Sequence, residues 1–337
     1  MTAGFYLLAC VAIVAWQAPA TPPAPIQERI DRVKADLYSR TDRLDENVKE
    51  LKQILALDPR SADAHMLLGI AYSTWGSREL KGEAIGEFRQ ALDLNPRLVE
   101  VRFYMARLYL DLGRPSRARE ELDTALEQRP GHPEFLALLG ETERQLKNPS
   151  RAIEVTRQAL QADSTFGPAR YYLGLALLDA GQRDEGIKEL EQIVRAGAPV
   201  ADAYLALGAA YTDAGRGAEA VDILGRGLRI DPARPELHVA LARAYRSMGQ
   251  LEKADAQLTR VQPKRGSIAE SSDYPYQQVE LDFHLEYGTI KLARGQLAAA
   301  AEAFKKVLAL EPSHEAATRG LAEANRRLRR KDPGGDH

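Results

Sequence analysis

Small residues recur every 34 positions along much of this chain, and this period limits its possible folds more than any other feature. One column of small residues contains Gly69, Ala106, Gly140, Gly174, Gly208, Ala242 and Gly288. Four consecutive steps in this column are 34 residues long, while the first is 37 and the last is 46. A second column contains Ala84, Ala118, Ala152, Gly186, Ala220, Ala254 and Ala300. A period of this length is typical of stacked repeats rather than of a single globular core.

Each period is expected to contain two amphipathic helices joined by a short turn. In residues 201–234, apolar side chains such as Leu207, Ala210 and Tyr211 recur at helical spacing. Glycines that can adopt a positive φ stand where the first helix of a period should end: Gly113, Gly181, Gly215, Gly249 and Gly295. Prolines that cannot continue a helix stand near the end of the second: Pro96, Pro130, Pro232 and Pro312.

Two of the periods have a fuller set of characteristic residues. One has His65, Leu68, Gly69, Tyr72, Ala84, Phe88, Ala91 and Pro96, and the other has Tyr204, Leu207, Gly208, Tyr211, Ala220, Leu224, Gly227 and Pro232. This pattern resembles the tetratricopeptide repeat family, whose 34-residue unit has Trp, Leu, Gly, Tyr, Ala, Phe, Ala and Pro at these places. The resemblance implies an all-α fold, a right-handed α-solenoid or superhelix of about eight helix-turn-helix repeats. It is specific for fold and unspecific for function, because the family consists mostly of scaffolds.

The repeats predict one elongated array over residues 28–331. Its units are expected at 28–61, 62–98, 99–132, 133–166, 167–200, 201–234, 235–267 and 281–314, followed by a terminal helix at 315–331. Three extra residues fall near 76–82, and a longer insertion falls within about 263–280. The insertion is interpreted as a tolerated surface loop, and a loop that enters the groove or touches a partner is the alternative. Residues 21–27 are expected to form a Pro-rich spacer, and 332–337 a disordered tail.

The first 20 residues contain no charged side chain and predict a secretory signal peptide. An apolar run covers 4–16, and Ala-Pro-Ala at 18–20 resembles a cleavage site. The run is short for a membrane span, but an uncleaved anchor remains an alternative. A third possibility is lipidation of Cys10, which follows a lipobox-like Leu-Leu-Ala. The expected location is therefore periplasmic or secreted, or else membrane-anchored through the N-terminus.

Composition argues against several kinds of chemistry. The chain has 46 basic and 48 acidic residues, a balance that does not favour binding to nucleic acid. Its only cysteine is Cys10, so no disulfide framework or cysteine zinc site is expected in the array. Three histidines, His65, His238 and His284, occupy the column where the family prefers Trp and are interpreted as packing residues. No nucleotide-binding or hydrolase motif is present. The sequence therefore predicts no enzyme, no metal site and no cofactor.

Partner-binding residues are predicted on the first helix of each unit, because the resemblance places these helices on the concave face. The candidates are Met66, Ile70, Phe103, Arg107, Leu110, Tyr171, Leu175, Leu178, Leu205, Thr212, Val239, Arg243 and Arg246. The same columns also contain Ala137, Glu141, Arg144 and Ala209. An apolar strip flanked by charge suits an amphipathic helix or an extended segment with apolar anchors. The carboxylate clamp and the asparagine ladder of some family members are not expected, because apolar or aromatic residues fill most of the matching columns.

The expected function is a non-catalytic protein–protein interaction scaffold that is exported from the cytoplasm and binds a protein or peptide. The alternative is an accessory or assembly subunit of a cell-envelope enzyme or of a secretion or biogenesis complex, acting through loop, convex or terminal surfaces. A basic run near the end consists of Arg326, Arg327, Arg329, Arg330 and Lys331. Positive charge suits a helix C-terminus, and contact with anionic lipid or an acidic partner is the other interpretation.

Overall fold

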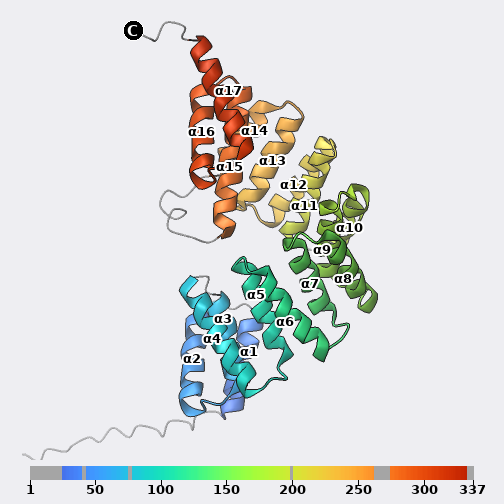
Figure 1. Ribbon diagram of the computed structural model, residues 1–337, viewed down its shortest axis with the longest axis vertical. Helices are drawn as coiled ribbons and strands as arrows, with labels where there is room; N and C mark the ends of the chain where they lie inside the picture. The colour runs from blue at the N-terminus through green and yellow to red at the C-terminus, as the bar shows by residue number, and fades with distance from the viewer. Residues whose placement is uncertain (1–24, 40–42, 75–77, 198–199, 262–273, 332–337) are drawn as a thin grey trace, which may run out of the picture.

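The computed structural model describes residues 25–39, 43–74, 78–197, 200–261 and 274–331. These residues form 17 helices and contain no strand. The expected signal segment with Cys10, most of the spacer, the expected tail and the first part of the insertion lie outside them. Figure 1 shows the helices following one another along a curved path, with α1 and α17 in its opposite end regions.

The described residues form eight helix pairs and one final helix. The first four pairs are α1 (Ile26–Tyr38) with α2 (Leu44–Leu57), α3 (Ala62–Thr74) with α4 (Arg78–Leu94), α5 (Val99–Asp111) with α6 (Pro115–Gln128), and α7 (Pro133–Gln145) with α8 (Pro149–Ala162). The other four are α9 (Gly167–Asp179) with α10 (Arg183–Arg195), α11 (Ala201–Asp213) with α12 (Gly217–Ile230), α13 (Pro235–Ser247) with α14 (Leu251–Leu258), and α15 (Tyr274–Ala293) with α16 (Leu297–Leu310). The final helix is α17 (Glu315–Lys331). Each pair packs on its neighbours in the chain, so the predicted α-solenoid is confirmed.

The first column of small residues lies where the two helices of a pair come closest. A Cβ atom at Gly208 would lie 2.4 Å from the side chain of Leu224 on the second helix. At Gly140 the corresponding distance, to Thr156, would be 2.2 Å. Carbon atoms cannot approach this closely, so at these two glycines a larger residue would force the helices apart. A small residue therefore recurs every 34 positions because the two helices of each pair pack closely at that place.

The turns inside the pairs form as the glycine spacing predicts. The φ angles at Gly113, Gly181, Gly215, Gly249 and Gly295 lie between +66° and +78°. After Gly215, the N–H of Arg216 donates to the carbonyl of Tyr211 at 2.8 Å and closes the last turn of α11. Lys147 takes the equivalent place between α7 and α8 with a φ of +63°. A non-glycine residue in this conformation carries about 1 kcal/mol of strain.

The irregular segments differ from expectation in three places. α1 begins at Ile26, so the last two residues of the expected spacer are helical. α4 begins at Arg78, so part of the extra sequence near 76–82 lengthens this helix. Residues 274–280 belong to α15, so the expectation of a loop throughout the insertion is wrong for its last part. Pro275 does not prevent this, because the N–H groups of a first turn need no acceptor within the helix.

The column where the family prefers Trp contains polar side chains that pair with the second helix of the same unit. Four such cross-helix pairs join His65 Nδ1 with Glu87 at 2.6 Å, Arg102 with Glu121 at 2.7 Å, Arg170 with Glu189 at 2.9 Å, and His238 Nδ1 with Gln257 at 3.0 Å. Because the partners recur at the same two places of the unit, this polar contact is itself a repeated feature. The interpretation of His65 and His238 as packing residues is therefore incomplete.

His284 occupies the same column in α15, and we expect it to make the fold less stable in mild acid. Burial, together with the nearby charge of Lys306, lowers the pKa of this imidazole below 6.5. The unfolded chain then binds the proton more readily than the folded chain. Stability from this group is complete above a pH of about 6.5 and decreases as the pH falls toward the folded-state pKa.

Replacing His284 by Gln should remove this part of the pH dependence. Thermal unfolding midpoints of both proteins, measured from about pH 7.5 down to about pH 5, would show the original chain losing more stability. Parallel curves for the two proteins would contradict the expectation.

Candidate partner-binding groove

The first helices of the pairs lie on the inner side of the curved path. α7 packs against α9, α11 against α13 and α13 against α15, whereas the second helices of neighbouring pairs do not pack closely together. Helices that approach one another more closely than their partners form the concave side of a solenoid. In Figure 1, α5, α7, α9 and α11 follow one another along this side. The first helices therefore build the candidate groove.

The first helices in the middle of the array have partly exposed aromatic and aliphatic side chains. The half-buried residues Phe103, Tyr104, Leu110, Tyr171, Tyr172, Leu175, Leu178 and Leu205 are termed the apolar strip. Phe103 and Tyr104 meet edge to face with their ring centroids 5.6 Å apart, and the rings of Tyr171 and Tyr172 are 5.5 Å apart. Each ring is held by a neighbour and keeps some exposed surface, which is the arrangement that a binding partner can use.

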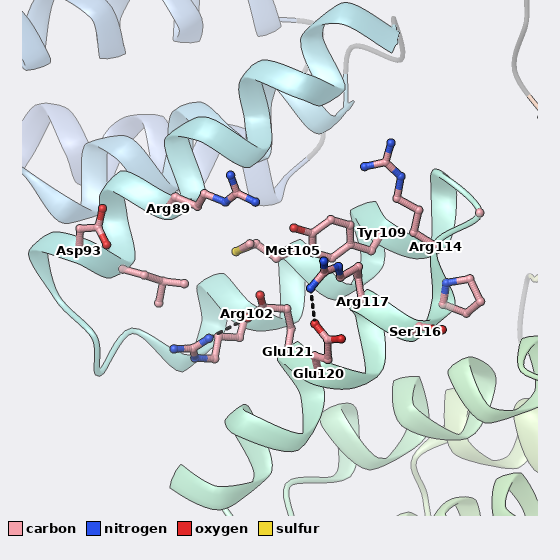
Figure 2. Close-up of a pocket in the computed structure, with 13 residues that line it drawn as sticks. Arg89, Asp93, Arg102, Met105, Tyr109, Arg114, Ser116, Arg117, Glu120 and Glu121 are labelled. Atoms are coloured by element: carbon pink, nitrogen blue, oxygen red, sulfur yellow. Dashed lines mark hydrogen bonds and ion pairs between the residues drawn. The ribbon is translucent and has the colours of Figure 1, made fainter.

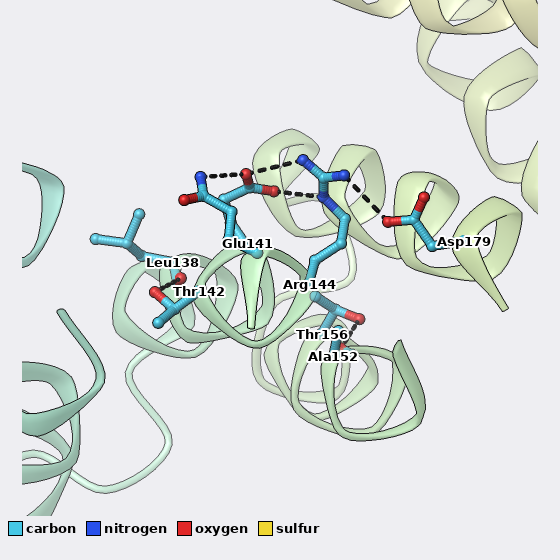
Figure 3. Close-up of polar contacts among 8 residues, drawn as sticks. Leu138, Glu141, Thr142, Arg144, Ala152, Thr156 and Asp179 are labelled. Carbon is cyan, nitrogen blue, oxygen red and sulfur yellow. Dashed lines mark hydrogen bonds and ion pairs between the residues drawn. The ribbon is translucent and has the colours of Figure 1, made fainter. Parts of the chain in front are cut away.

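α7 contributes a charged network to the same face. Arg144 donates to both oxygens of Glu141, at 2.8 and 3.0 Å, and also to Asp179 of α9 at 3.0 Å. Figure 3 shows these contacts. Because Glu141 is only 9% exposed, Arg144 neutralises a carboxylate that has lost most of its water. The network also ties α7 to α9.

The hydroxyl of Tyr171 is protonated at physiological pH. Burial raises its pKa, and the negative charges of Asp202 and Glu141 raise it further. No hydrogen-bond partner for this hydroxyl occurs among the described residues. The group is therefore free to donate to a carbonyl or carboxylate oxygen of a partner.

Two of the predicted arginines are already engaged inside the protein. Arg246 donates to both oxygens of the buried carboxylate of Glu286, at 2.5 and 3.2 Å, and Arg243 lies 3.7 Å from the same carboxylate. A small cavity of about 150 Å³ remains beside them, between α11, α13 and α15. Its lining includes Leu205 and Val279, so this end of the groove has both apolar and charged walls.

Four predicted groove residues are buried. The prediction that they face outward is wrong for Met66, Ile70 and Thr212, whereas Val239 also lines the small cavity between α11, α13 and α15. Met66 and Ile70 are 4% and 7% exposed and share a cluster with Ile30, because α1 packs against α3. Val239 is 5% exposed and lies in a cluster that includes residues of α15. Thr212 is 9% exposed, and its hydroxyl donates to a carbonyl of its own helix at 2.8 Å.

The other predicted groove residues keep some exposure, and their part in partner binding stays a prediction. They are Phe103, Arg107, Leu110, Tyr171, Leu175, Leu178, Leu205, Arg243 and Arg246. Sequence reasoning did not include Tyr104 and Tyr172 among the partner-binding candidates. One signal could have found the two tyrosines, since each directly follows a predicted member. Adjacent side chains on a helix point about 100° apart, so both can border one groove.

The described residues contain neither a metal-binding cluster nor a membrane-crossing helix. Among them, no group of three or more His, Cys, Asp or Glu side chains could hold a metal ion. No helix within the described ranges combines the length and apolar character that crossing a membrane requires. What the groove does present is aromatic surface, aliphatic surface and paired charge.

Two family models, both described as Tetratricopeptide repeat, match the chain. One matches residues 82–141 and 211–267, and the other matches 171–235 and 285–332. Together they cover more than half of the 337 residues. No curated protein matches the sequence.

Several solved structures are similar to this chain. A crystal structure of the APC/C hetero-tetramer Cut9–Hcn1 matches with a TM-score of 0.62 and 15% identity, over 89% of this chain and 55% of that one. The chain thus spans about half the length of that relative, and the similarity shows the fold alone. A tetratricopeptide repeat protein from Parabacteroides merdae ATCC 43184 matches with a TM-score of 0.47 and 20% identity, over 89% of this chain and 98% of that one. YrrB, described as a TPR protein with an unusual peptide-binding site, matches with a TM-score of 0.39 and 17% identity, over 56% and 95%.

Proposed function

This chain belongs to the tetratricopeptide repeat family, and from that premise we propose that it is a non-catalytic scaffold that holds a protein partner in its groove. Tetratricopeptide repeat proteins generally mediate protein–protein interactions. The proposed partner presents an apolar or amphipathic segment. The observation that carries the proposal is the apolar strip, whose half-buried side chains belong to the first helices of the pairs.

The layout of the strip suits a partner with apolar side chains at helical spacing. The aromatic pair on α5, Phe103 and Tyr104, and the aromatic pair on α9, Tyr171 and Tyr172, lie on either side of α7. An amphipathic helix could place apolar side chains on both pairs and a polar one over the charged network of α7. Arg107 is exposed, with its guanidinium 6.0 Å from the ring centroid of Phe103, and would contact an acidic residue of the partner.

Export from the cytoplasm is part of the proposal. It is supported by the uncharged first 20 residues, with their apolar run and the Ala-Pro-Ala that follows. An uncleaved segment would instead hold the groove close to a membrane surface. The mass of the mature protein distinguishes the two states, because cleavage removes the segment.

Replacing Tyr171 and Leu205 by Asp should abolish capture of the partner while the array stays folded. Each Asp places a charge in the strip, and a bound apolar segment would have to remove its water. A crosslinked pull-down from native cells measures the effect. The matched control replaces Ile230 and Leu310 by Asp, because these exposed apolar residues end α12 and α16, which are second helices.

A partner that is lost only from the groove variant supports the proposal. Circular dichroism must show that both variants are as helical as the original chain. Partners that the groove variant captures as well as the original chain does would contradict the proposal.

A second candidate is an accessory subunit that binds through the end of the array. The observation that favours it is an open cavity of about 500 Å³ on α17, lined by Arg326, Arg329, Arg330, Ala322 and Asn325. An acidic partner or an anionic lipid surface would complement this charge. Replacing Arg329 and Arg330 by Glu would then remove a partner that the groove variant retains.

A further inference from the structure

A basic cavity lies apart from the groove, between the second helix of one unit and both helices of the next. Its volume is about 810 Å³, and residues of α4, α5 and α6 line it (Figure 2). Arg89 comes from α4, Arg114 directly precedes α6 as its N-cap residue, and Arg117 lies in the first turn of α6. Met105 and Tyr109 of α5 supply part of the wall. None of these residues belongs to the apolar strip.

Two of these arginines have no anionic partner within the described residues. No carboxylate of that part of the chain lies within ion-pair distance of Arg89 or Arg114, and no hydrogen bond engages the Tyr109 hydroxyl. Arg117 lies 2.8 Å from Glu120, but both side chains are more than half exposed, so this pair is weak. The positive charge of Arg89 and Arg114 is therefore not balanced by a carboxylate within the described residues.

The remaining charged side chains of the lining do not change this balance. Arg102 donates to Glu121 at 2.7 Å, and its Nε is buried without an acceptor among the described residues. Asp93 also lines the cavity, but Figure 2 shows it at the opposite side from Arg114. Arg89 and Arg114 are thus the lining arginines that have no anion within the described residues.

The positions of Arg89, Tyr109, Arg114 and Arg117 have equivalents 102 residues later, which is three periods of 34. Two of these equivalents are carboxylates. Tyr109 and Arg114 correspond to Tyr211 and Arg216, Arg89 corresponds to Glu191, and Arg117 corresponds to Glu219. The later copy therefore shows what the tyrosine and the arginine do when negative charge is present.

In the later copy the carboxylates complete the contacts. Tyr211 donates to Glu191 at 2.8 Å, and burial and this hydrogen bond raise its pKa to about 12. Arg216 donates to Glu219 at 2.8 Å, and its guanidinium carbon lies 4.1 Å from the ring centroid of Tyr211. The tyrosine and the arginine thus hold anionic oxygens. The earlier copy keeps both residues and replaces both carboxylates by arginine.

We propose that the earlier copy binds a phosphate monoester, whose oxygens take the place of the two carboxylates. Such a group has about two negative charges and three acceptor oxygens, which suits the forks of Arg89, Arg114 and Arg117. The carbon part of the ligand lies against Met105 and Tyr109. The cavity volume is within the range of about 300–1,000 Å³ that is typical of small-ligand sites. A monocarboxylate supplies half of the charge and leaves an arginine unpaired.

Binding of phenyl phosphate to the full chain, measured by titration calorimetry, tests the proposal. Arg114→Ala should weaken binding about tenfold or more, because a charge-assisted hydrogen bond is lost. Arg216→Ala is the matched control and should leave binding unchanged. Arg89→Glu should abolish binding and raise the thermal unfolding midpoint, because it restores the carboxylate that the later copy has at Glu191.

Two other probes identify the ligand class. Inorganic phosphate that binds more weakly than phenyl phosphate supports an organic ester, and equal binding supports free phosphate at the same dianion site. Benzoate that binds as tightly as phenyl phosphate overturns the requirement for a dianion. No measurable binding of phenyl phosphate to the original chain, or binding that survives both Arg114→Ala and Arg89→Glu, overturns the site itself. The groove variant with Tyr171 and Leu205 replaced should bind phenyl phosphate normally, so the two proposals can fail separately.

Discussion

Replacing Gly208 by Val should lower the free energy of unfolding by about 3 kcal/mol, near the upper end of the usual cost of overpacking. Gly208 lies on α11 in the first column of small residues, and a Cβ there would lie 2.4 Å from Leu224 of α12. Leu224 is completely buried, so it can withdraw only by displacing other core atoms. The two helices would have to separate, and the contacts of this pair with both neighbouring pairs would weaken with them. Urea unfolding followed by circular dichroism measures the loss.

The matched control is Gly225→Ala in the same helix pair. A Cβ at Gly225 would meet nothing within 4 Å, so no contact opposes the change. Alanine in a helix interior is favoured over glycine by about 1 kcal/mol, and this variant should therefore be more stable than the original chain. If both glycine replacements shifted stability in the same direction, close packing would not be the reason for the small residue at Gly208.

Replacing Arg246 by Ala should cost about 3 kcal/mol of stability, whereas replacing its partner Glu286 by Gln should cost about 1 kcal/mol. The side chain of Glu286 is 4% exposed and that of Arg246 is 32% exposed. Loss of the arginine leaves a buried carboxylate with only Arg243, at 3.7 Å. Loss of the negative charge leaves an arginine that can turn toward water. The cost is therefore unequal, although the same ion pair is broken.

Urea unfolding of both single variants and of the double variant measures this asymmetry. The double variant should be close to Glu286→Gln alone, because no buried charge is then left unpaired. Equal losses for the two single variants would mean that the carboxylate reaches water in the folded protein. Since Arg246 supports the fold, any change in partner binding on its replacement would have two causes, and Tyr171 and Leu205 are the better test of the groove.

The fold could be predicted from the sequence because its determinants are local and repeated. The small residue at Gly208 and the turn glycine at Gly215 each act within one helix pair, so one period is enough to reveal their roles. The start of α15 could not be predicted in the same way. Residues 274–280 have no counterpart in the other units. They extend the first helix of the last helix pair at its N-terminal end.

The groove was less predictable because exposure depends on how neighbouring units lie against one another. Met66 is in the expected column, but α1 of the irregular first unit packs against its helix. Glu286 takes the column of Tyr104 and Tyr172, and its partner Arg246 lies 40 residues earlier, on the other side of the insertion. The sequence period predicts where a side chain lies within one unit. It does not predict how neighbouring units pack, and this packing determines which side chains stay exposed.

The contacts of the array run between neighbouring helix pairs, and this has a consequence for how the chain folds and opens. Because the close helix contacts of the described chain join neighbouring pairs, little loop-closure entropy opposes folding, and folding can begin at any pair and spread in both directions. A pair at either end has one neighbour instead of two, so it opens more readily than a central pair. The concave face spans several pairs, and it is continuous only while all of them are closed. Opening of one central pair would divide it into two shorter surfaces, each with its own rigid orientation.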